Sequence, residues 1–350
     1  MYFRYPINDA HIHAFTLEMA DEVVRMADEL GYEHFNMLSG SNYMPRWTAN
    51  NLLCARIKQL APGRAYAFAS FNYPERGVPD SDELLRQARL FRALGFDGIK
   101  MMDGKPTMRL RTGVALDDAR YDAMFDYLEE TGLPVLYHVN DPWEFWHWDA
   151  MPDWAKAHGR ALFYGETGNP GKEQIEREAE NILKKHPRLK LIFAHWFFTS
   201  TDIARTEQLF CDYPNMSYDI TPGWEMFESF QEKYDEWRPF FIEHADRILF
   251  GSDTVSDHWR ETIACLRRAM ETDEEFWAFE EKCKGLDLPE APLRKIYYDN
   301  FFRYLPKQPA KLDVDGLLAY AEDLKRSVKG FKDEAEIASD IEAFAGALKN

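Results

Sequence analysis

Short apolar runs alternate with amphipathic segments along most of the 350-residue chain. Eight of the runs have the length and apolar character of buried strands: residues 7–12, 34–38, 65–71, 98–102, 134–138, 190–195, 216–220 and 247–251. The segments between them repeat apolar residues at intervals of three and four, which is typical of helices that cover a sheet. The clearest of these are 17–30, 81–94, 117–131 and 172–186. This alternation predicts an α/β protein with a parallel sheet, because parallel strands need crossover connections.

Eight is the number of strands that closes a (β/α)8 TIM barrel, and we predict this fold. A doubly wound open sheet is the alternative, but the chain contains no GxGxxG or GxxxxGK[ST] sequence that would favour a nucleotide-binding fold. We expect the catalytic barrel to span residues 1–306. Residues 307–350 have a charged, helical pattern. They are expected to form a helical C-terminal extension that packs on the barrel or on a neighbouring subunit.

Charge and composition exclude several classes of function. The formal net charge of −18 argues against nucleic acid as a partner, because phosphate binding needs clustered lysine and arginine. The N-terminal MYFRYPINDA has no apolar signal-peptide core, and no stretch approaches the ~18 apolar residues of a membrane span. Cys54, Cys211, Cys265 and Cys283 lack metal-site spacing. We therefore expect a soluble, cytoplasmic protein that acts on a small molecule. A homodimer is the base-rate expectation for its assembly.

Residues with metal-binding chemistry stand at the ends of the predicted strands. In Asp9-Ala10-His11-Ile12-His13 the two histidines point to the same face of a strand, because strand side chains alternate. Such a pair occurs by chance in many proteins, so its position matters more than the motif. Further candidates lie at the ends of the fourth, fifth, sixth and eighth runs: Lys100, His138, His195 and Asp253. In a barrel these ends converge on one mouth, and nitrogen and carboxylate ligands suit Zn²⁺, Mn²⁺ or Fe²⁺.

This order of residues resembles the amidohydrolase superfamily of metal-dependent barrels. The AHW ending of the sixth run, the GSD after the eighth and YYDNFF at 297–302 are most similar to one branch of it. That branch holds aminocarboxymuconate-semialdehyde decarboxylase, resorcylate decarboxylases and sugar or pyrone lactonases. The resemblance covers roughly residues 7–305. It implies the fold and a metal site, but it does not identify the substrate, because members of the family differ mainly in their loops.

The resemblance and the chemistry together imply roles for the site residues. His11, His13 and His138 would bind one divalent transition metal, most simply zinc with manganese or iron as alternatives, and Asp253 would add an oxygen ligand. Asp253 could also accept a proton from water and pass it to the leaving group. His195 could polarise a substrate carbonyl, bind a second metal, or be a core histidine bonded to the backbone.

Lys100 has two interpretations. In two-metal members of the superfamily, a lysine on this strand is carboxylated and bridges the ions. In the branch that this chain resembles, an unmodified lysine can instead pair with a substrate carboxylate. We favour one metal, with Lys100 in contact with the substrate.

The loops suggest a substrate with a flat face. Trp143, Trp146, Trp148 and Trp154 lie in the long connection 139–189, and Trp196 follows the sixth run. These aromatic rings could stack on a planar substrate or only pin loops to the rim. For a substrate carboxylate, Arg109 is the arginine we predict to bind it, with Arg46 and Arg111 as further candidates. Glu166 is a candidate acid or an ion-pair partner.

The function we expect is a metal-dependent hydrolase that activates water against an ester, lactone or amide carbon of a small carboxylated or cyclic substrate. The first alternative is a metal-dependent decarboxylase of an aromatic or dienoic acid, in which a carboxylate is held against the metal and carbon is protonated. The second alternative is a catalytically silent barrel that binds a ligand or partner. It would be expected to lack a metal ligand, and none is missing from the sequence.

Overall fold

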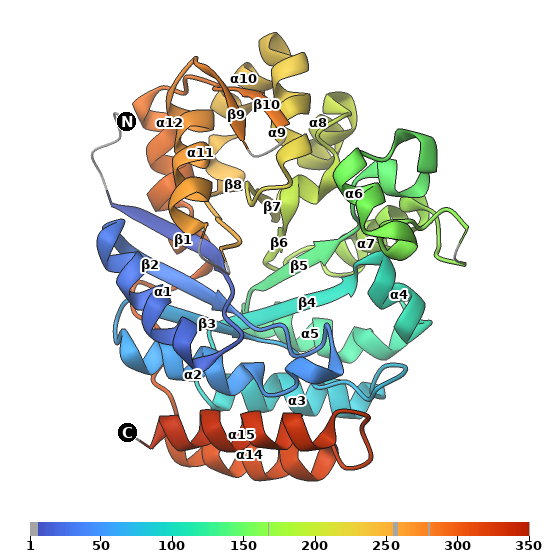
Figure 1. Ribbon diagram of the computed structural model, residues 1–350, viewed down its shortest axis with the longest axis vertical. Coiled ribbons are helices and arrows are strands. Elements are labelled where there is room, and N and C mark those ends of the chain that lie inside the picture. The colour runs from blue at the N-terminus through green and yellow to red at the C-terminus, as the bar shows by residue number, and fades with distance from the viewer. Residues whose placement is uncertain (1–5, 167, 255–257, 279–280, 350) are drawn as a thin grey trace.

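The computed structural model describes residues 6–166, 168–254, 258–278 and 281–349. Eight parallel strands pair in chain order within one sheet (Figure 1): β1 Ile7–Ile12, β2 Tyr32–Leu38, β3 Ala65–Ala69, β4 Gly98–Gly104, β5 Val135–Val139, β6 Leu191–Phe193, β7 Met216–Asp219 and β8 Ile248–Leu249. The last strand meets the first, because the Ala10 amide donates to the Phe250 carbonyl (2.9 Å) and Ile12 bridges Thr254. The predicted (β/α)8 barrel is confirmed.

Helices cover the outside of this barrel. The α-helices before the C-terminal region are α1 Leu17–Glu29, α2 Asn50–Leu60, α3 Ser81–Ala93, α4 Pro106–Thr112, α5 Asp122–Thr131, α6 Asp153–Ala157, α7 Lys172–Lys185, α8 Ile203–Asp212, α9 Trp224–Glu232, α10 Tyr234–Glu243, α11 Trp259–Glu271, α12 Glu290–Arg294 and α13 Phe301–Tyr304. The cap residues explain several boundaries. Thr16 and Asp80 accept hydrogen bonds from the first turns of α1 and α3, and α5 stops at Gly132, whose φ is 66°.

Short helical turns fill several connections at the barrel mouth. They are η1 Pro45–Trp47, η3 Trp143–Trp146, η4 Trp148–Ala150, η5 Gly159–Leu162 and η6 His195–Phe198. Other short elements lie elsewhere: η2 Ala119–Tyr121, η7 Ala245–Arg247, the π-helical turn η8 Lys295–Asp299 and the antiparallel pair β9 Glu275–Ala278 and β10 Glu281–Lys284. The sixth strand is shorter than its apolar run predicts, because the chain leaves the sheet at Ala194 and turns at His195. Among the described residues, no helix is long and apolar enough to cross a bilayer.

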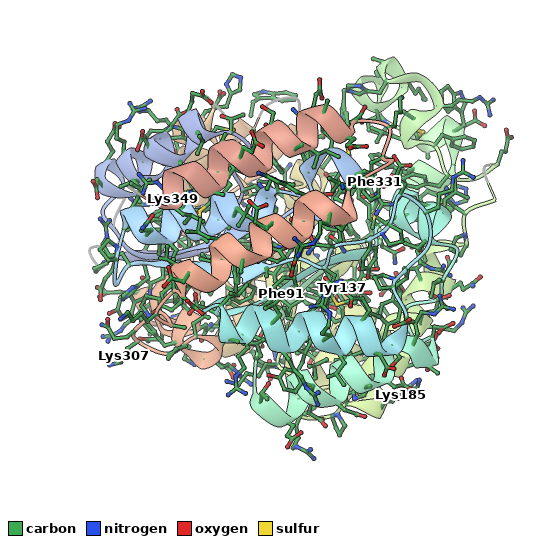
Figure 2. All side chains as sticks on the ribbon, turned by 90° about the horizontal axis from the view of Figure 1, so that it is seen from below. Phe91, Tyr137, Lys185, Lys307, Phe331 and Lys349 are labelled. Carbon is green, nitrogen blue, oxygen red and sulfur yellow. The ribbon has the colours of Figure 1, made fainter. Side chains whose placement is uncertain are left out.

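The C-terminal region forms two helices, α14 Val314–Ser327 and α15 Glu334–Leu348, which lie side by side against α2 and α3 (Figures 1 and 2). The Tyr320 ring contacts Phe91 of α3 edge-on at 6.0 Å, and its hydroxyl accepts hydrogen bonds from Asn51 and Asn72. Arg46 in η1 forms ion pairs with two carboxylates of α15. The extension therefore contacts barrel loops of its own chain through both apolar and polar groups.

Candidate metal centre and substrate pocket

A pocket of about 370 Å³ opens at the carboxyl ends of the strands, where barrel enzymes place their active sites. Six of the residues predicted from the sequence line it: His11, His13, Lys100, His138, His195 and Asp253. They come from five different strand ends, so only closure of the barrel brings them together. The convergence inferred from the strand pattern is therefore present in the structure.

The two histidines at the end of β1 are each oriented by a different hydrogen-bond acceptor. The Nδ1 atom of His11 lies 2.8 Å from an Asp219 carboxylate oxygen, and Nδ1 of His13 lies 2.7 Å from the Leu38 carbonyl. Both partners can only accept, so each Nδ1 carries the hydrogen and each Nε2 presents a lone pair. Burial, together with the nearby Lys100, lowers the pKa of His13 to about 3 and that of His11 well below its ordinary value. Both imidazoles are thus neutral, as metal ligands must be.

Asp253 completes a three-residue cluster. The His11 and His13 Nε2 atoms are 3.2 Å apart, and Asp253 Oδ1 lies 3.4 Å and 3.5 Å from them. Two ligands of a tetrahedral ion with bonds of about 2.0–2.1 Å are about 3.3–3.4 Å apart. Two lone pairs and a carboxylate that face one another repel unless a cation lies between them. The donor set therefore fits a divalent transition metal. Among the residues that the structure describes, these three form the group whose nitrogen and oxygen atoms are close enough together to bind one metal ion.

Packing and hydrogen bonds of the first and last strands fix this cluster. Asp9 Oδ1 accepts from the amides of His11 (3.0 Å) and Ser252 (3.2 Å), so one buried carboxylate joins the two segments that carry the ligands. A Cβ on Gly251 would lie 2.9 Å from the Cβ of His11, which explains the glycine of the GSD sequence. Asp219 orients His11 and also accepts from the His195 amide at 2.8 Å. Sequence reasoning missed Asp219, although its place at the end of β7 was a usable signal.

His138 and His195 share the pocket but are held differently. His138 Nε2 lies 2.9 Å from the Asn140 carbonyl and 3.3 Å from Asp141, so this nitrogen carries the hydrogen and Nδ1 is the atom with a lone pair. His138 is not within ligand spacing of the three-residue cluster, and its metal-binding role remains a prediction. His195 Nδ1 lies 3.2 Å from the Thr221 hydroxyl, and its Nε2 lies 4.0 Å from Asp253.

Three strand ends at this mouth carry left-handed backbone. Asn140 has a φ of 72°, Asp253 one of 52°, and the four successive residues 195–198 have φ values between 53° and 55°. Left-handed backbone costs an L-residue about 1–2 kcal/mol, and such strain gathers at functional sites. In η6 this turn places His195 and Phe198 on the pocket wall, whereas Trp196 and Phe197 are buried in the core.

Lys100 lies at the floor of the pocket, with Nζ 3.4 Å from His11 Nε2. Burial lowers the pKa of Lys100, while Asp253 and Asp219 oppose the change. Burial raises the pKa of Asp253, and Lys100 lowers it. A carboxylate at this position, beside the histidine pair and inside the pocket, is placed for acid–base chemistry.

A second lysine, Lys105, lines the pocket and was not predicted. Its Nζ donates to Asp141 Oδ1 at 2.8 Å, and the other Asp141 oxygen accepts from the Tyr164 hydroxyl at 2.6 Å. Burial alone would lower the pKa of Lys105, but Asp141 outweighs it and raises that pKa. Lys105 begins the segment after β4, where the sequence shows only a glycine and a proline on either side. No sequence pattern distinguishes it from a surface lysine.

Aromatic rings form the walls of the pocket. One set is Phe15, Tyr43 and Trp47, and the other is Phe145, Trp154 and Phe198. Phe15 stacks on Trp47 with 4.2 Å between ring centroids, and it also lies parallel to His13 at 5.9 Å. Of the four tryptophans predicted in the long loop, Trp154 lines the pocket, while Trp143 is 44% exposed and stacks on His147.

Two residues predicted to bind substrate lie outside the pocket lining. Arg109 is buried and forms two hydrogen bonds to Glu178 of α7 (3.1 and 3.0 Å), which connect α4 to that helix. Trp196 is fully buried and stacks on Phe241 at 4.6 Å, because the left-handed turn directs it into the core. These positions correct both predictions: the two residues have structural roles.

The remaining charged candidates are also engaged elsewhere. Arg46 pairs with α15, as described above. Arg111 donates to the carbonyls of Asn42 and Tyr43, and Glu166 forms an exposed ion pair with Arg160. None of these three lines the pocket. Among lysine and arginine side chains, Lys100 and Lys105 are the ones that line the described pocket.

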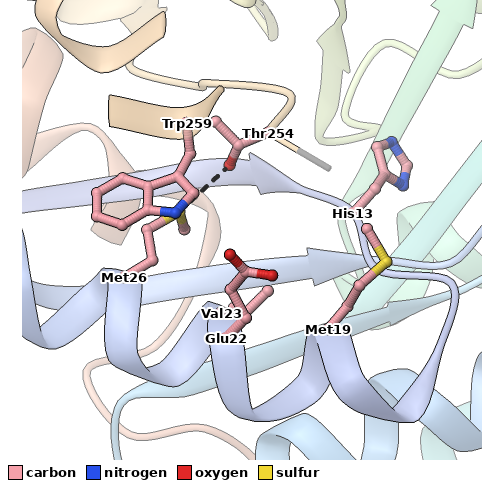
Figure 3. A pocket seen from close by; sticks show the side chains of 7 residues that line it. All are labelled: His13, Met19, Glu22, Val23, Met26, Thr254 and Trp259. Atoms are coloured by element: carbon pink, nitrogen blue, oxygen red, sulfur yellow. Dashed lines mark hydrogen bonds between the residues drawn. The ribbon is translucent and has the colours of Figure 1, made fainter. Parts of the chain in front are cut away.

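A second, much smaller cavity of about 20 Å³ lies between α1 and α11 (Figure 3). His13, Glu22 and Thr254 contribute its polar lining, and the Thr254 hydroxyl donates to the Met26 sulfur at 3.7 Å. A space of this size holds one water molecule and no substrate. The pocket at the barrel mouth, by contrast, is large enough for a substrate and contains the cluster of His11, His13 and Asp253.

The family model for amidohydrolases matches residues 9–303. A 2,6-dihydroxybenzoate decarboxylase in complex with 2,6-dihydroxybenzoate superposes with a TM-score of 0.53 at 17% identity, over 86% of this chain and 99% of that one. The 4-oxalomesaconate hydratase of Rhodopseudomonas palustris gives 0.53 at 16% identity, over 91% and 99%. A protein assigned as a 2-pyrone-4,6-dicarboxylic acid hydrolase from Pseudomonas putida gives 0.51 at 14%, over 86% and 97%.

No curated protein matches the sequence. At these identities the structural neighbours show a shared fold. The match to the family model extends from the residue that begins the DAHIH sequence to the end of the barrel, and the histidine and aspartate cluster lies within it. The chain belongs to the amidohydrolase family.

Proposed function

We propose that this protein is a metal-dependent hydrolase that acts on an ester, lactone or amide carbon of a small carboxylated or cyclic molecule. The observation that carries the proposal is the cluster of His11 Nε2, His13 Nε2 and Asp253 Oδ1, whose separations of 3.2, 3.4 and 3.5 Å suit one transition metal. When bound, such an ion makes water acidic enough to supply hydroxide near pH 7 and polarises a carbonyl. Zinc is the metal we expect, with manganese and iron as alternatives.

The chain supplies the remaining chemistry. Asp253, which lies 3.4 Å and 3.5 Å from His11 and His13 Nε2, accepts a proton from the attacking water and passes it to the leaving group. His195, held by Thr221, stabilises the charge that develops on the substrate oxygen. His138 adds a third imidazole if its Nδ1 turns to the cluster. The aromatic walls hold a flat substrate and keep bulk water away from it.

A decarboxylase is the second candidate, and a specific observation favours it. Lys100 Nζ lies 3.4 Å from His11 Nε2, so a substrate carboxylate could be held between an ammonium and the metal site. Decarboxylases and a protein assigned as a hydrolase both use this fold, so the fold does not decide between them. In this reaction Asp253 would protonate the carbon that loses CO2.

Metal content per chain is the first test, measured by elemental mass spectrometry on protein purified without chelators or a histidine tag. About one transition metal per chain, lost in His13→Ala, supports the single-metal proposal. About two would indicate a carboxylated Lys100 that bridges a binuclear site. Protein that stays metal-free after reconstitution would refute both.

The second test separates the two reactions. Metal-replete protein is incubated with a panel of lactones, esters and amides, with released acid as the readout, and with aromatic and dienoic acids, with released CO2 as the readout. Asp253→Asn should lower the active reaction by about 10²–10⁴-fold. An unchanged rate in Asp253→Asn would remove this residue from proton transfer.

A further inference from the structure

Lys105 is a cation with unused hydrogen-bonding capacity on the pocket wall. Its side chain is 17% exposed, and its hydrogen bond to Asp141 at 2.8 Å satisfies one of the three donors of an ammonium. Within the part of the chain that the structure describes, no other protein acceptor bonds to it. Two donors are thus available to a molecule in the pocket.

Lys58, a buried lysine outside this pocket, illustrates an ammonium with only a structural role. Lys58 is 4% exposed, and its Nζ donates both to Asp97 and to the Gly95 carbonyl. It lines none of the pockets found in the structure around the barrel mouth. Lys105 differs in both respects, because it has a single acceptor and it faces the substrate pocket. A lysine that served only in an internal ion pair would not need to face the pocket with unsatisfied N–H groups.

Asp141 is built to hold Lys105 in place. This carboxylate is buried, with Oδ1 shared between Lys105 and His138 and Oδ2 bonded to the Tyr164 hydroxyl at 2.6 Å. Because its oxygens are already engaged, Asp141 cannot itself bind a ligand cation without losing these bonds. It fixes the position of the ammonium and balances its charge. The charge that the pair offers to the pocket is therefore positive.

The neighbouring rings define the shape of the molecule that would reach this ammonium. Tyr43 and Trp47 stand on one wall, and Phe145 and Trp154 on the other. Planar groups stack on such rings. The volume of about 370 Å³ accommodates one substituted ring.

We propose that Lys105 binds an anionic group of the substrate, and that this group is distinct from the one that reacts at the His11, His13 and Asp253 cluster. The substrate is then a flat molecule with an acidic substituent besides its reacting group. The inference rests on the proposed function only in taking this pocket as the substrate site.

The test compares pairs of small acids that differ in a single charge. Terephthalate is paired with 4-carbamoylbenzoate, and isophthalate with 3-carbamoylbenzoate, so each pair exchanges one carboxylate for a neutral amide of similar shape. Binding to metal-replete protein is measured by titration calorimetry. The wild type should bind the better diacid at least about tenfold more tightly than its amide partner, since a hydrogen bond to a charged group is worth that factor.

Lys105→Met should abolish that preference and leave the affinity for the amide acid within about twofold. Lys105→Gln serves as a second variant, and Lys105→Arg should keep part of the preference. Lys185→Met is the matched control, because Lys185 is 42% exposed and paired with Asp122 away from the pocket. The control should behave as the wild type. Metal content verifies that each variant retains the centre.

A preference that survives in both Lys105→Met and Lys105→Gln would overturn the proposal. A wild type that shows no preference in either pair, or binds none of the four acids at millimolar concentration, would overturn it as well. The readout needs no turnover, so it is separable from the proposed reaction. A charge preference that depends on Lys105 in a protein without hydrolase or decarboxylase activity would support the subsite and refute the function.

Discussion

Replacing Trp196 tests whether this residue is a core anchor within a left-handed turn. Its side chain is fully buried and contacts Phe241, Phe230 and Trp237 with centroid distances of 4.6, 5.1 and 5.8 Å. Truncation of a large buried aromatic residue costs about 3–5 kcal/mol. Trp196→Ala should therefore lower the free energy of unfolding by that amount. If Trp196 were instead an exposed residue at the pocket rim, the same substitution would lower it by only about 0.5 kcal/mol or less.

A comparison of Trp196→Gly with Trp196→Ala tests the left-handed backbone at this position. Trp196 has a φ of 55° and a ψ of 22°. Alanine in this conformation carries a strain of about 1–2 kcal/mol that glycine avoids, and the greater freedom of glycine in the unfolded chain takes back about 0.5–1 kcal/mol. Trp196→Gly should therefore be more stable than Trp196→Ala by about 0.5–1 kcal/mol. This order is opposite to that in helices and strands.

Urea unfolding of chelator-treated protein, followed by circular dichroism, measures both effects. Ala343→Gly is the matched control for the exchange, because Ala343 is an exposed residue of the right-handed helix α15 and should lose about 1 kcal/mol. Trp277→Ala removes a 67% exposed ring and should change stability by less than about 0.5 kcal/mol. A Trp196→Gly protein less stable than Trp196→Ala would refute the left-handed turn. A loss below about 1 kcal/mol in Trp196→Ala would refute the anchor.

Three further outcomes are expected. Asp219→Asn should weaken metal binding about 10–100-fold, measured by competition with a chromophoric chelator, because His11 loses the carboxylate that orients it; unchanged affinity would argue against that role. Arg109→Met should lower the free energy of unfolding by about 3–5 kcal/mol, because Glu178 is left unpaired, and should not change the affinity for the carboxylic acids of the binding test. A weaker affinity for these acids would show that Arg109 does contribute to substrate binding. In the metal-free protein, the stability advantage of the wild type over His13→Ala should shrink by about 1.4 kcal/mol per pH unit as pH falls from about 6.5 to about 4.5. The reason is that the folded pKa of His13 is depressed to about 3, so the unfolded wild type takes up a proton that the variant cannot; a difference that stays constant over this range would contradict the depressed pKa.

Much of the fold could be predicted because it depends on local periodicity. Each of the eight predicted runs overlaps a strand of the barrel, and each predicted helix overlaps a helix of the structure. The boundaries differ where tertiary contacts intervene. The run 190–195 ends two residues early as a strand, because His195 begins a left-handed turn that no apolar pattern encodes.

The site was predictable in part for the same reason. His11, His13, His138, His195, Lys100 and Asp253 line one pocket because strand ends converge in a barrel, which follows once the strands are placed. Lys105 and Asp219 were missed, since their importance comes from partners 36 and 208 positions away in the chain. Arg109 was misassigned for the converse reason: its partner Glu178 belongs to a helix that the sequence does not place beside α4.

The sequence by itself determined the barrel, the order of the chemical residues around it and their position at strand ends. The strands and helices follow from local periods of two and 3.6 residues, and the parallel barrel follows from their alternation along the chain. The tertiary structure alone decided which nitrogen of each histidine faces the pocket, which lysine remains available to a ligand, and whether a tryptophan or an arginine faces substrate or core. Those outcomes depend on contacts between residues distant in the chain. A buried polar group must find a hydrogen-bond partner, and once a protein group provides it, the buried group is no longer available to a ligand.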